Sequence, residues 1–318
     1  MRVSVIVPFF NPGPTFTQCL ASLNALHRNE ADFQVILVDN NSTDGSDRLA
    51  SQAGFTVVRE THAQTSYAAR NRGLSVADGD IVVFTDSDCV VTPGWLAAFL
   101  RAARRDVCAG AFAGRIRAHA PRRLIERFSE RRSTLHEEIL LQHTYKPFAQ
   151  TANLAVRREV FDRIGGFRAD LVSGGDGDFC WRMQDAGFRL VHVPEAGVAH
   201  VHRTCVSGLW EQWFRYGRGQ VALSRLHPGY RPPFPAGYSA VLDRARAGAL
   251  RFADAAVVAL DRLGSSEWTG LDPLLDRIRI TALGAGILHE RAQPYPAMAS
   301  GPAGLAADRA RPAGPDAV

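Results

Sequence analysis

The chain has 318 residues, of which 46% are hydrophobic and 22% charged, an ordinary globular composition that can bury a full core in one large or two small domains. An excess of 37 Lys and Arg over 32 Asp and Glu leaves a net charge of +5, which favours phosphorylated ligands or an anionic membrane surface. No basic tract is interleaved with aromatic residues as a nucleic-acid groove requires, so we do not expect a nucleic-acid partner.

The cysteines and the apolar stretches bear on the compartment. The five cysteines are scattered and form no C-x-x-C pair, which indicates a reducing environment. The chain starts directly with a strand-like segment, so we expect no signal peptide, and its best apolar stretch, residues 280–288, is too short to span a bilayer. We therefore expect a cytoplasmic protein, in the cytosol or at the inner face of the membrane.

The first third of the chain alternates strands and helices. Residues 3–10 form an apolar, β-branched run that N-P-G ends at residues 11–13, and leucines at helical spacing follow. Further strands are predicted at residues 33–38 and 56–59, and a helix at residues 66–77. A succession of strand, helix and strand places the strands parallel to one another.

The next predicted strand ends in a pair of acids. Residues 81–85 are all apolar or β-prone, the D-S-D turn follows at residues 86–88, and P-G-W at residues 93–95 opens a helix. Such a strand is typically central and buried on both faces, and open α/β sheets bind ligands at the carboxyl ends of their strands. An Asp-x-Asp there suits a hard divalent cation that carries phosphate oxygens, although the same pair can serve as a turn and a helix N-cap.

These elements predict an α/β fold, a nucleotide-binding sandwich with a central, mostly parallel sheet flanked by helices. The chain has neither G-x-G-x-x-G after its first strand nor G-x-x-x-x-G-K-[ST] anywhere, so the dinucleotide-binding and P-loop interpretations lose their main support. The first loop offers Pro8, Phe9 and Asn11 instead.

The middle of the chain is less regular. Residues 107–116 are strand-like, and residues 121–141 predict one long amphipathic helix. Seven arginines lie between residues 115 and 132, and they form either a solvated face or a surface for an anionic acceptor or lipid. Strands are further predicted at residues 153–156 and 188–193, a tight turn at 164–167, and helices at 178–186 and 208–226.

Past residue 230 the sequence loosens into a Pro-rich linker that leads to two helices rich in Ala, Leu and Arg, at residues 241–263 and 273–289. These helices could pack on the preceding domain, form a homodimer or rest on a membrane; we expect packing first. The tail, residues 291–318, is rich in Ala, Pro and Gly and is predicted to be disordered.

Six motifs follow one another between residues 3 and 220: V-S-V-I-V-P-F-F-N, V-D-N-N-S-T-D-G-S, A-A-R-N-R-G, F-T-D-S-D-C, the pair G-G-F and G-G-D-G-D-F-C-W-R, and Q-W-F-R-Y. In this order the chain resembles the family 2 glycosyltransferases with the GT-A fold. The resemblance implies an enzyme that moves a sugar from a nucleotide-sugar to a glycan, lipid-linked or small-molecule acceptor, with inversion and with Mg²⁺ or Mn²⁺ on the diphosphate. It also implies a GT-A domain over residues 1–228, with a nucleotide-binding half at 1–106 and an acceptor-binding half at 107–228, followed by a helical extension at 229–290.

Matched to the motifs of that family, the donor contacts fall in the first loop and at strand ends. Pro8 and Asp39 would contact the nucleoside, although a carboxylate at a strand end is also a common N-cap. Arg70 would touch the ribose or a phosphate, or else lie solvated, and Arg215 of Q-W-F-R-Y would meet the diphosphate. The nucleotide-binding residues expected on this basis are Pro8, Phe9, Asn11, Asp39, Arg70, Asp86, Ser87 and Arg215.

The same matching places a metal at the D-S-D motif. Asp88 would be the direct metal ligand, and Asp86 would hold the ribose or a metal-bound water. A cation there would neutralise the charge that develops on the leaving diphosphate. His200 and His202 lie in H-V-H, where alternate side chains face the same way, and one of them would lie at the metal or the diphosphate. The Cys89 thiol is too soft a ligand for such a cation, so we expect it to pack.

The general base aligns with Asp176. Here the sequence departs from the family, because Gly175 stands where an acidic neighbour would raise the pKa of the base. Asp178 is the second candidate for the base, unless it caps the helix that follows. Two other functions stay open: a nucleotidyltransferase, which would need a Gly-rich, basic first loop, and a catalytically silent nucleotide-sugar-binding protein, which the missing acid suggests.

Overall fold

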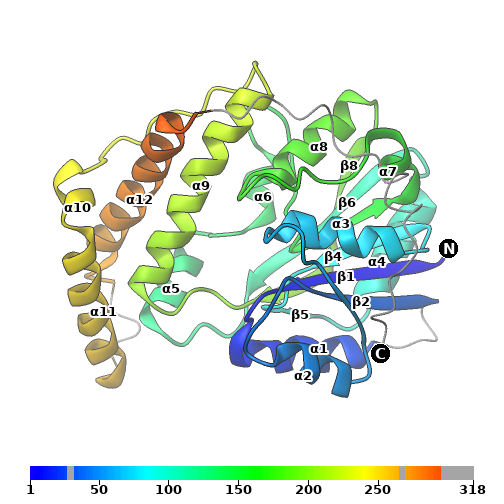
Figure 1. The fold of residues 1–318 in the computed structure, drawn as a ribbon, viewed down its shortest axis with the longest axis horizontal. Helices are drawn as coiled ribbons and strands as arrows, with labels where there is room; N and C mark the ends of the chain where they lie inside the picture. Colours follow the sequence, from blue (N-terminus) through cyan, green and yellow to red (C-terminus); the bar gives the residue numbers. More distant parts are fainter. Residues whose placement is uncertain (27–31, 265–268, 295–318) are drawn as a thin grey trace.

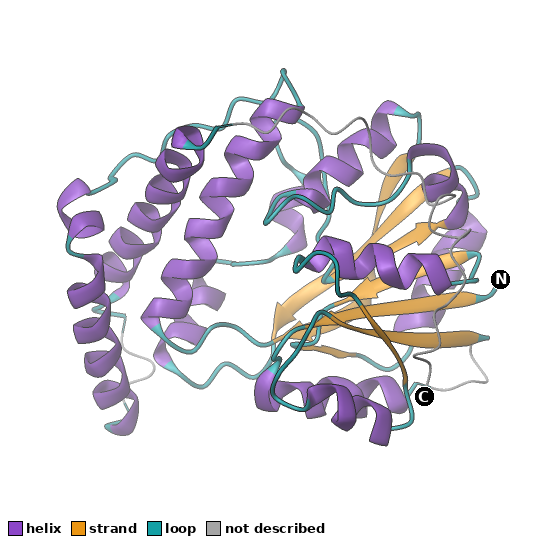
Figure 2. Cartoon of the chain, viewed as in Figure 1, coloured by secondary structure: helices purple, strands orange, loops and turns teal. Residues whose placement is uncertain are grey.

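An eight-stranded sheet crosses the computed structural model, which describes residues 1–26, 32–264 and 269–294 (Figures 1 and 2). Its strand order is β3-β2-β1-β4-β7-β6-β8-β5. The strands are β1 Val3–Phe9, β2 Phe33–Asp39, β3 Thr56–Arg59, β4 Ile81–Thr85, β5 Cys89–Val91, β6 Ala109–Ala118, β7 Asn153–Arg157 and β8 Arg189–His200. The helices are α1 Phe16–Asn24, α2 Ser46–Gln52, α3 Ser66–Val76, α4 Trp95–Arg105, α5 Leu124–Arg131, α6 Glu137–Leu141, α7 Arg158–Ile164, α8 Gly175–Asp185, α9 Val206–Leu226, α10 Ala240–Arg244, α11 Arg246–Arg262 and α12 Asp272–Ala292, and a short 3-10 helix, Gly13–Thr15, precedes α1.

The sheet is parallel in its first half and mixed in its second. Strands β3, β2, β1 and β4 pair in parallel, whereas β7 is antiparallel to both β4 and β6. Strand β6 then pairs in parallel with β8, and β5 is antiparallel to β8. All five residues of β4 are buried, and β4 lies fourth in the order, which confirms the prediction of a central strand.

Two hydrophobic clusters cover the two faces of this sheet. The odd-numbered residues of β1, such as Val5, pack with Leu20 of α1 and Trp95 of α4. Ile6 points to the other face and packs with Leu74 of α3 and Phe179 of α8. Helices on both faces explain why these strands are mostly apolar along their length. The predicted α/β sandwich is therefore confirmed.

Three predicted elements that precede the C-terminal helices differ in the structure. The single helix predicted at residues 121–141 is wrong: α5 and α6 are separate, because Ser133 and Leu135 take positive φ angles of 49° and 71° and break the helical backbone. The strand predicted to end before Pro194 continues to His200 as β8, since a shift of register between Gly114 and Arg115 on β6 accommodates the extra residues. Helix α8 starts at Gly175 instead of residue 178. The short β5, α2 and α7 were not predicted.

The C-terminal helices pack on α5 and α9, as we expected. Their shared core includes Phe128 of α5, Leu209 of α9, Val257 of α11 and Ile278 of α12. The helix predicted at residues 241–263 is broken at Ala245, between α10 and α11. Among the described residues, no helix is both long enough and apolar enough to cross a membrane. Helix α12 continues to Ala292 and so includes the first residues of the predicted disordered tail; residues 295–318 of that tail lie outside the described residues.

The arginines before residue 133 are partly paired with acids. Arg131 Nη2 lies 2.6 Å from Asp272 Oδ1, and Arg132 Nη2 lies 2.5 Å from Asp276 Oδ2. Both acids belong to α12, so these ion pairs attach the C-terminal extension to α5. They add directional contacts to the hydrophobic packing between the two parts of the chain. For these two arginines, the alternative of a purely solvated face is therefore wrong.

Candidate active site

A cavity of about 690 Å³ lies at the carboxyl ends of β1 and β4, where parallel α/β sheets bind ligands. Residues from both halves of the chain line it. Of the residues predicted as site residues, those at the cavity are Pro8, Phe9, Arg70, Asp86, Ser87, Asp88, Asp176, His200 and Arg215. Those that do not line it are Asn11, Asp39, Asp178 and His202.

The D-S-D acids occupy the turn between β4 and β5. The backbone N–H of Cys89 donates to the carbonyl of Asp86 at 3.0 Å, which closes the turn. Arg70 comes from α3, is only 4% exposed, and donates through Nη2 to Asp86 Oδ1 at 2.5 Å. Arg70 is thus not solvated, and it holds the first acid of the motif in place.

Asp88 and His200 face each other across the β5–β8 pair. His200 lies opposite Cys89 in the register, and its Nε2 atom is 3.4 Å from Asp88 Oδ1. Both Asp88 Oδ1 and His200 Nδ1 are buried, and neither makes a hydrogen bond. Together with the Cys89 thiol, their ligand atoms lie within 4.8 Å of one another. A buried carboxylate oxygen without a donor beside an imidazole nitrogen suits a divalent cation.

The Cys89 thiol is held in its protonated form. Burial raises its pKa well above the usual value, and the nearby charges of Asp88 and Asp86 raise it further. A thiol must lose its proton to become a good metal ligand. The side chain is also fully buried. The geometry therefore supports the prediction that Cys89 packs in the core.

Asp176 lies in the first turn of α8 and lines the same cavity as Asp88. Thr151 Oγ1 donates a hydrogen bond of 2.9 Å to Asp176 Oδ1. Burial raises the pKa of Asp176 to about 6, against the opposing effects of Arg70 and the Thr151 hydrogen bond, and the Asp86 charge adds to the rise. A carboxylate with this pKa is a suitable general base near neutral pH.

The structure gives a reason for the glycine that precedes this base. A Cβ atom on Gly175 would lie 2.7 Å from Cζ of Tyr67 and 2.8 Å from two other carbons of that ring. Tyr67 thus fills the space that an acidic side chain at position 175 would need. An acidic neighbour would raise the pKa of Asp176, and burial already raises it. The pKa of the base is therefore raised even though the acidic neighbour is missing.

Asp178, the second candidate for the base, is 1% exposed and does not reach the cavity. Its carboxylate lies 2.8 Å from Arg182 Nε, 3.1 Å from His227 Nε2 and 3.5 Å from Arg168 Nε. Burial alone would raise the pKa of Asp178, but these three groups outweigh it and lower the pKa. Asp178 is therefore a buried structural ion, and its prediction as a base is not supported by the geometry.

Two residues that were predicted to contact the donor accept hydrogen bonds from a neighbouring backbone instead. Asp39 is 1% exposed, accepts from the backbone N–H of Ser42 at 2.8 Å, and lies 3.6 Å from Arg59 Nε. The Asn11 side chain accepts from the backbone N–H of Thr43 at 2.8 Å. Asn40, the residue after Asp39, lines the cavity instead, and its buried Oδ1 has no hydrogen-bond partner.

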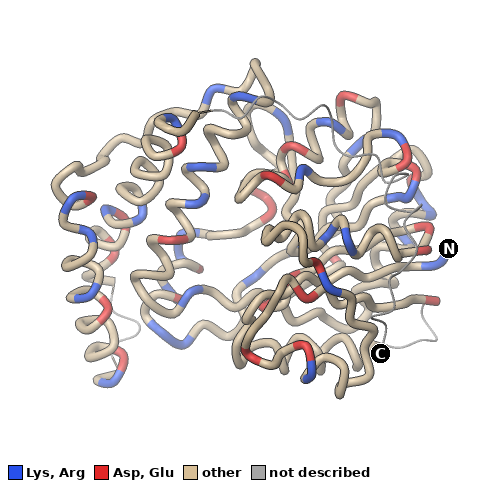
Figure 3. The backbone as a smooth tube through the Cα atoms, in the orientation of Figure 1, with Lys and Arg blue, Asp and Glu red and all other residues tan. Residues whose placement is uncertain are grey.

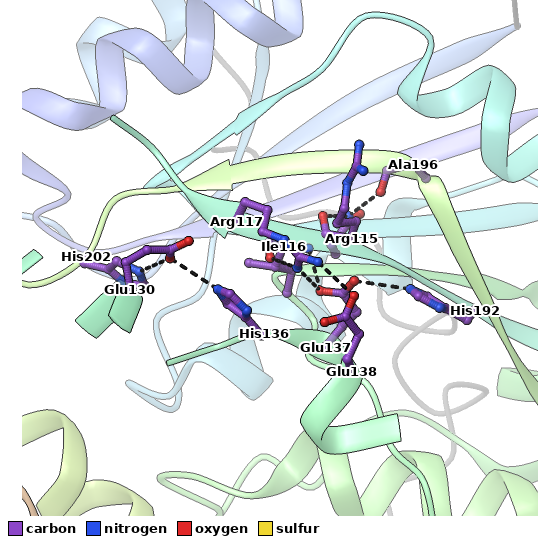
Figure 4. A network of polar contacts seen from close by, with 11 residues as sticks. Arg115, Ile116, Arg117, Glu130, His136, Glu137, Glu138, His192, Ala196 and His202 are labelled. Carbon is purple, nitrogen blue, oxygen red and sulfur yellow. Dashed lines mark hydrogen bonds and ion pairs between the residues drawn. The ribbon is translucent and has the colours of Figure 1, made fainter. Parts of the chain in front are cut away.

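A polar network beside the cavity holds His202 and the loop that carries His136 (Figure 4). Glu130 lies between the two imidazoles, with Oε2 at 3.5 Å from His202 Nε2 and 3.2 Å from His136 Nε2. Burial, together with the electrostatic influence of the neighbouring His200, lowers the pKa of His202 to about 4, although Glu130 opposes this shift. His202 is thus a neutral, buried support, and of the two predicted histidines only His200 reaches the cavity.

The buried Glu137 anchors the other end of the same loop. It accepts from the backbone N–H of Ile116 and from Arg117 Nη1, both at 2.9 Å, and it lies 3.2 Å from His192 Nε2 (Figure 4). These contacts join α6 to β6 and β8. The loop between α5 and α6, which lines the cavity, is therefore fixed at both ends.

Much of the second half of the cavity was not predicted from the sequence. One group is aromatic and is formed by His143, Phe148, Trp181 and Tyr230. The other group comes from α9 and α12, where the Arg279 guanidinium lies 4.5 Å from the centre of the Trp213 ring. The Q-W-F-R-Y motif could have pointed to Trp213, whereas no local pattern marks Arg279.

The chain is similar in sequence to a known protein family and to several curated proteins. A family model described as glycosyl transferase family 2 matches residues 4–165. Glycosyltransferase AglE of Haloferax volcanii is 29% identical over 234 residues, 70% of this chain and 74% of that protein. The pre-mycofactocin glycosyltransferase of Mycobacterium tuberculosis is 29% identical over 247 residues, 73% of this chain but 49% of that protein, so the chain spans about half of it. An N-acetylglucosaminyl-diphospho-decaprenol L-rhamnosyltransferase of the same organism is 30% identical over 62% of this chain and 75% of that protein.

Solved structures share the fold at lower sequence identity. The mannosyltransferase PcManGT from Pyrobaculum calidifontis, in complex with GDP-Man and Mn²⁺, superposes with a TM-score of 0.59 at 21% identity, over 90% of this chain and 87% of that one. Glucosyl-3-phosphoglycerate synthase from Mycobacterium tuberculosis, in complex with Mg²⁺ and UDP, superposes with a TM-score of 0.54 at 20% identity, over 74% and 82% of the two chains.

Proposed function

The chain belongs to glycosyl transferase family 2, and we propose that it moves a sugar from a nucleotide-sugar to an acceptor hydroxyl with inversion, assisted by a divalent cation and by Asp176 as the general base. It is a glycosyltransferase with a GT-A-type fold, so nucleotidyl transfer is set aside. The observation that carries the proposal is the convergence of the D-S-D acids, Arg70 and Asp176 on one cavity.

The donor occupies the half of the cavity formed by the first parallel strands. Pro8, Phe9 and Asn40 line this part, and the unpartnered Oδ1 of Asn40 offers an acceptor for a hydrogen bond from the nucleoside. Arg70 holds Asp86 beside the same space. The similar folds with bound GDP-Man or UDP support a donor of this class.

Asp88 and His200 are the residues that would hold the cation. Asp88 Oδ1 and His200 Nδ1 are both buried without a hydrogen-bond partner, and His200 Nε2 lies 3.4 Å from Asp88 Oδ1, which is the fit described above. When bound, a divalent cation supplies positive charge that stabilises the departing diphosphate. Ser87 and Arg215 line the same cavity and would meet the phosphate oxygens, with Arg215 as a further source of positive charge.

Asp176 receives the proton of the acceptor hydroxyl. As the acceptor oxygen forms its bond to the anomeric carbon, the bond from that carbon to the diphosphate oxygen breaks, and the nucleoside diphosphate leaves with the electron pair. Attack from the face opposite the leaving group inverts the anomeric configuration. The raised pKa of Asp176 favours its acceptance of a proton, and Thr151 orients its carboxylate.

The acceptor lies in the second half of the cavity. Aromatic rings such as Trp181 and Tyr230 suit the apolar face of a sugar or another flat group. Arg279 and Arg215 add cationic groups to the same space, which favours an acceptor that carries negative charge.

The test measures release of nucleoside diphosphate from uridine, guanosine, cytidine and thymidine diphosphate sugars, each with Mn²⁺, with Mg²⁺ and with EDTA. Wild-type protein is expected to consume one donor class with a cation and not with EDTA. Asp176→Asn is expected to lower this rate by about 10²- to 10⁴-fold while nucleotide binding persists in a thermal-shift assay. The anomeric configuration of the transferred sugar, read by NMR, tests inversion.

The matched control is Asp162→Asn, because Asp162 is an exposed acid of α7 outside the cavity. It should leave both binding and turnover unchanged. Full activity in Asp176→Asn would remove Asp176 from the mechanism. Cation-dependent nucleotide binding without transfer to any acceptor would instead support a silent sugar-nucleotide sensor.

A further inference from the structure

The C-terminal helices leave one face open to solvent. Helices α10 and α11 form the outermost layer of the molecule, and α12 and α9 lie between them and the sheet (Figure 1). The exposed residues of α11 recur at helical spacing, so they share one side of the helix. We name this side, with the exposed end of α10, the outer face; its large residues are Val241, Arg244, Arg251, Phe252, Val258 and Arg262.

The outer face exposes large apolar side chains. Among the described residues, four large hydrophobic side chains are more than 70% exposed, and three of them lie in or directly after these two helices. They are Phe252 at 79% and Val241 at 72%, both on the outer face, and Leu263 at 78%, directly after α11. An aromatic ring and branched aliphatic chains that stay in water on packed helices indicate a surface that meets an apolar partner.

The charges of α11 are divided between its two sides. Asp254 turns inward, where its Oδ1 accepts from the backbone N–H groups of Val206 and Ser207 at the start of α9, at 2.6 and 3.2 Å. Asp261 turns inward too, and its Oδ1 accepts from the backbone N–H of Leu124 at the start of α5, at 2.9 Å. Both acids stabilise helix N-termini, so neither neutralises the solvent side.

The arginines of the outer face are left without acids. Among the described residues, Arg251 and Arg262 have no carboxylate within ion-pair distance, and Arg244 donates only to a backbone carbonyl of its own helix. Figure 3 shows basic residues spaced along both helices. Asp243, the acid of α10, pairs with Tyr238 and Arg246. The outer face is therefore apolar and cationic, without an exposed acid of α11.

We infer that the outer face binds the surface of an anionic lipid bilayer. Arginines on a helix that also presents an aromatic ring and aliphatic side chains match anionic headgroups above an acyl region. Helix α11 has 17 residues and would lie along the surface rather than cross it. A second copy of the chain fits less well, because a two-fold contact through this face would oppose arginine to arginine. This inference does not depend on the proposed reaction.

Co-sedimentation with vesicles tests the inference on the full chain. Wild-type protein is expected to sediment with vesicles of phosphatidylcholine and phosphatidylglycerol, and to stay in the supernatant with phosphatidylcholine alone. Phe252→Ser with Val241→Ser, and separately Arg251→Gln with Arg262→Gln, should each weaken binding by at least about tenfold. High salt should weaken vesicle binding by the wild type more than it weakens vesicle binding by the variant with Arg251→Gln and Arg262→Gln.

A matched control comes from the far side of the chain, where Val107 is 71% exposed and Arg104 is also exposed. Val107→Ser with Arg104→Gln should sediment like the wild type. Equal loss in this control, or wild-type protein that ignores anionic vesicles at low salt, would overturn the inference. A dimer that Phe252→Ser converts to a monomer, without vesicle binding, would assign the face to a second copy instead. Circular dichroism on every variant checks that the fold is retained.

Discussion

Thr151 Oγ1 donates a hydrogen bond of 2.9 Å to Oδ1 of Asp176, so a residue just before β7 orients the carboxylate at the start of α8. This bond stabilises the ionised form of Asp176 and opposes the effect of burial, which raises the pKa to about 6. It therefore influences the pH at which Asp176 can act as a base.

Thr151→Val removes this hydrogen bond with little change in volume. The pKa of Asp176 should then rise further, because burial is no longer opposed by Thr151. The wild-type rate should fall as the pH drops through about 6, and the variant should lose activity at a higher pH and regain it in more alkaline buffer. The measurement is kcat/KM as a function of pH; superimposable profiles would contradict the prediction.

Asp176→Asn should stabilise the protein at neutral pH while it lowers activity. The pKa of Asp176 is raised on folding, so the folded state favours the protonated acid. The stability that this preference gives the folded state is fully present below the unfolded pKa of 3.8, and it is lost as the pH rises through about 6. At pH 7 the partly desolvated charge opposes folding, and its removal should add about 1–3 kcal/mol to the free energy of unfolding.

Urea unfolding of the wild type and the variant at pH 5 and pH 8 checks this prediction. The gain in stability should be larger at pH 8, where the wild-type carboxylate is ionised. Asp178→Asn is the contrasting variant, because Asp178 is a buried carboxylate paired with Arg182 and His227. It should lose stability, by about 2–4 kcal/mol, since it leaves buried cationic groups without their counter-ion. A loss of stability in Asp176→Asn as well would refute the assignment of a base whose pKa is raised by desolvation.

Cation-dependent nucleotide binding should require Asp88 and not Cys89. Asp88→Asn weakens the only acid of the facing Asp88–His200 pair, so the nucleotide should no longer raise the melting temperature more with Mn²⁺ than with EDTA. Cys89→Ala removes a buried thiol whose pKa is raised, and its cation-dependent shift should remain, although its own melting temperature falls. Loss of that shift in Cys89→Ala alone would make the thiol the metal ligand.

Arg279→Ala should impair the acceptor and spare the donor. Arg279 lies over Trp213 and pairs with Asp276 Oδ1 at 3.2 Å, on the wall of the second half of the cavity. For an anionic acceptor, loss of this cation should raise KM by about tenfold and leave nucleotide binding unchanged. Arg277→Ala is the control, since Arg277 is exposed on the same helix and does not line the cavity. An equal rise in KM for both variants would indicate that the overall positive charge of α12, and not Arg279 at the cavity, favours the acceptor.

The local sequence pattern was sufficient to predict the central strands of the sheet. Mostly apolar runs of strand length located β1, β2 and β4, and the D-S-D motif at the end of β4 located the cavity. This succeeds because burial on both faces of a sheet demands an unbroken apolar run. Prediction failed where short elements or backbone strain decide, as for the three-residue β5 and for the helix break at Ser133 and Leu135.

Tertiary structure alone decided which of several equivalent residues reach the cavity. Asp176 and Asp178 are two residues apart, as are His200 and His202, yet only the first of each pair lines the cavity. The second of each pair is claimed by partners distant in sequence, His227 for Asp178 and Glu130 for His202. Arg279 reaches the cavity because α12 packs on α9. Sequence fixes the periodicity and polarity of each segment, but the partner of a buried charge depends on which segments the fold brings together.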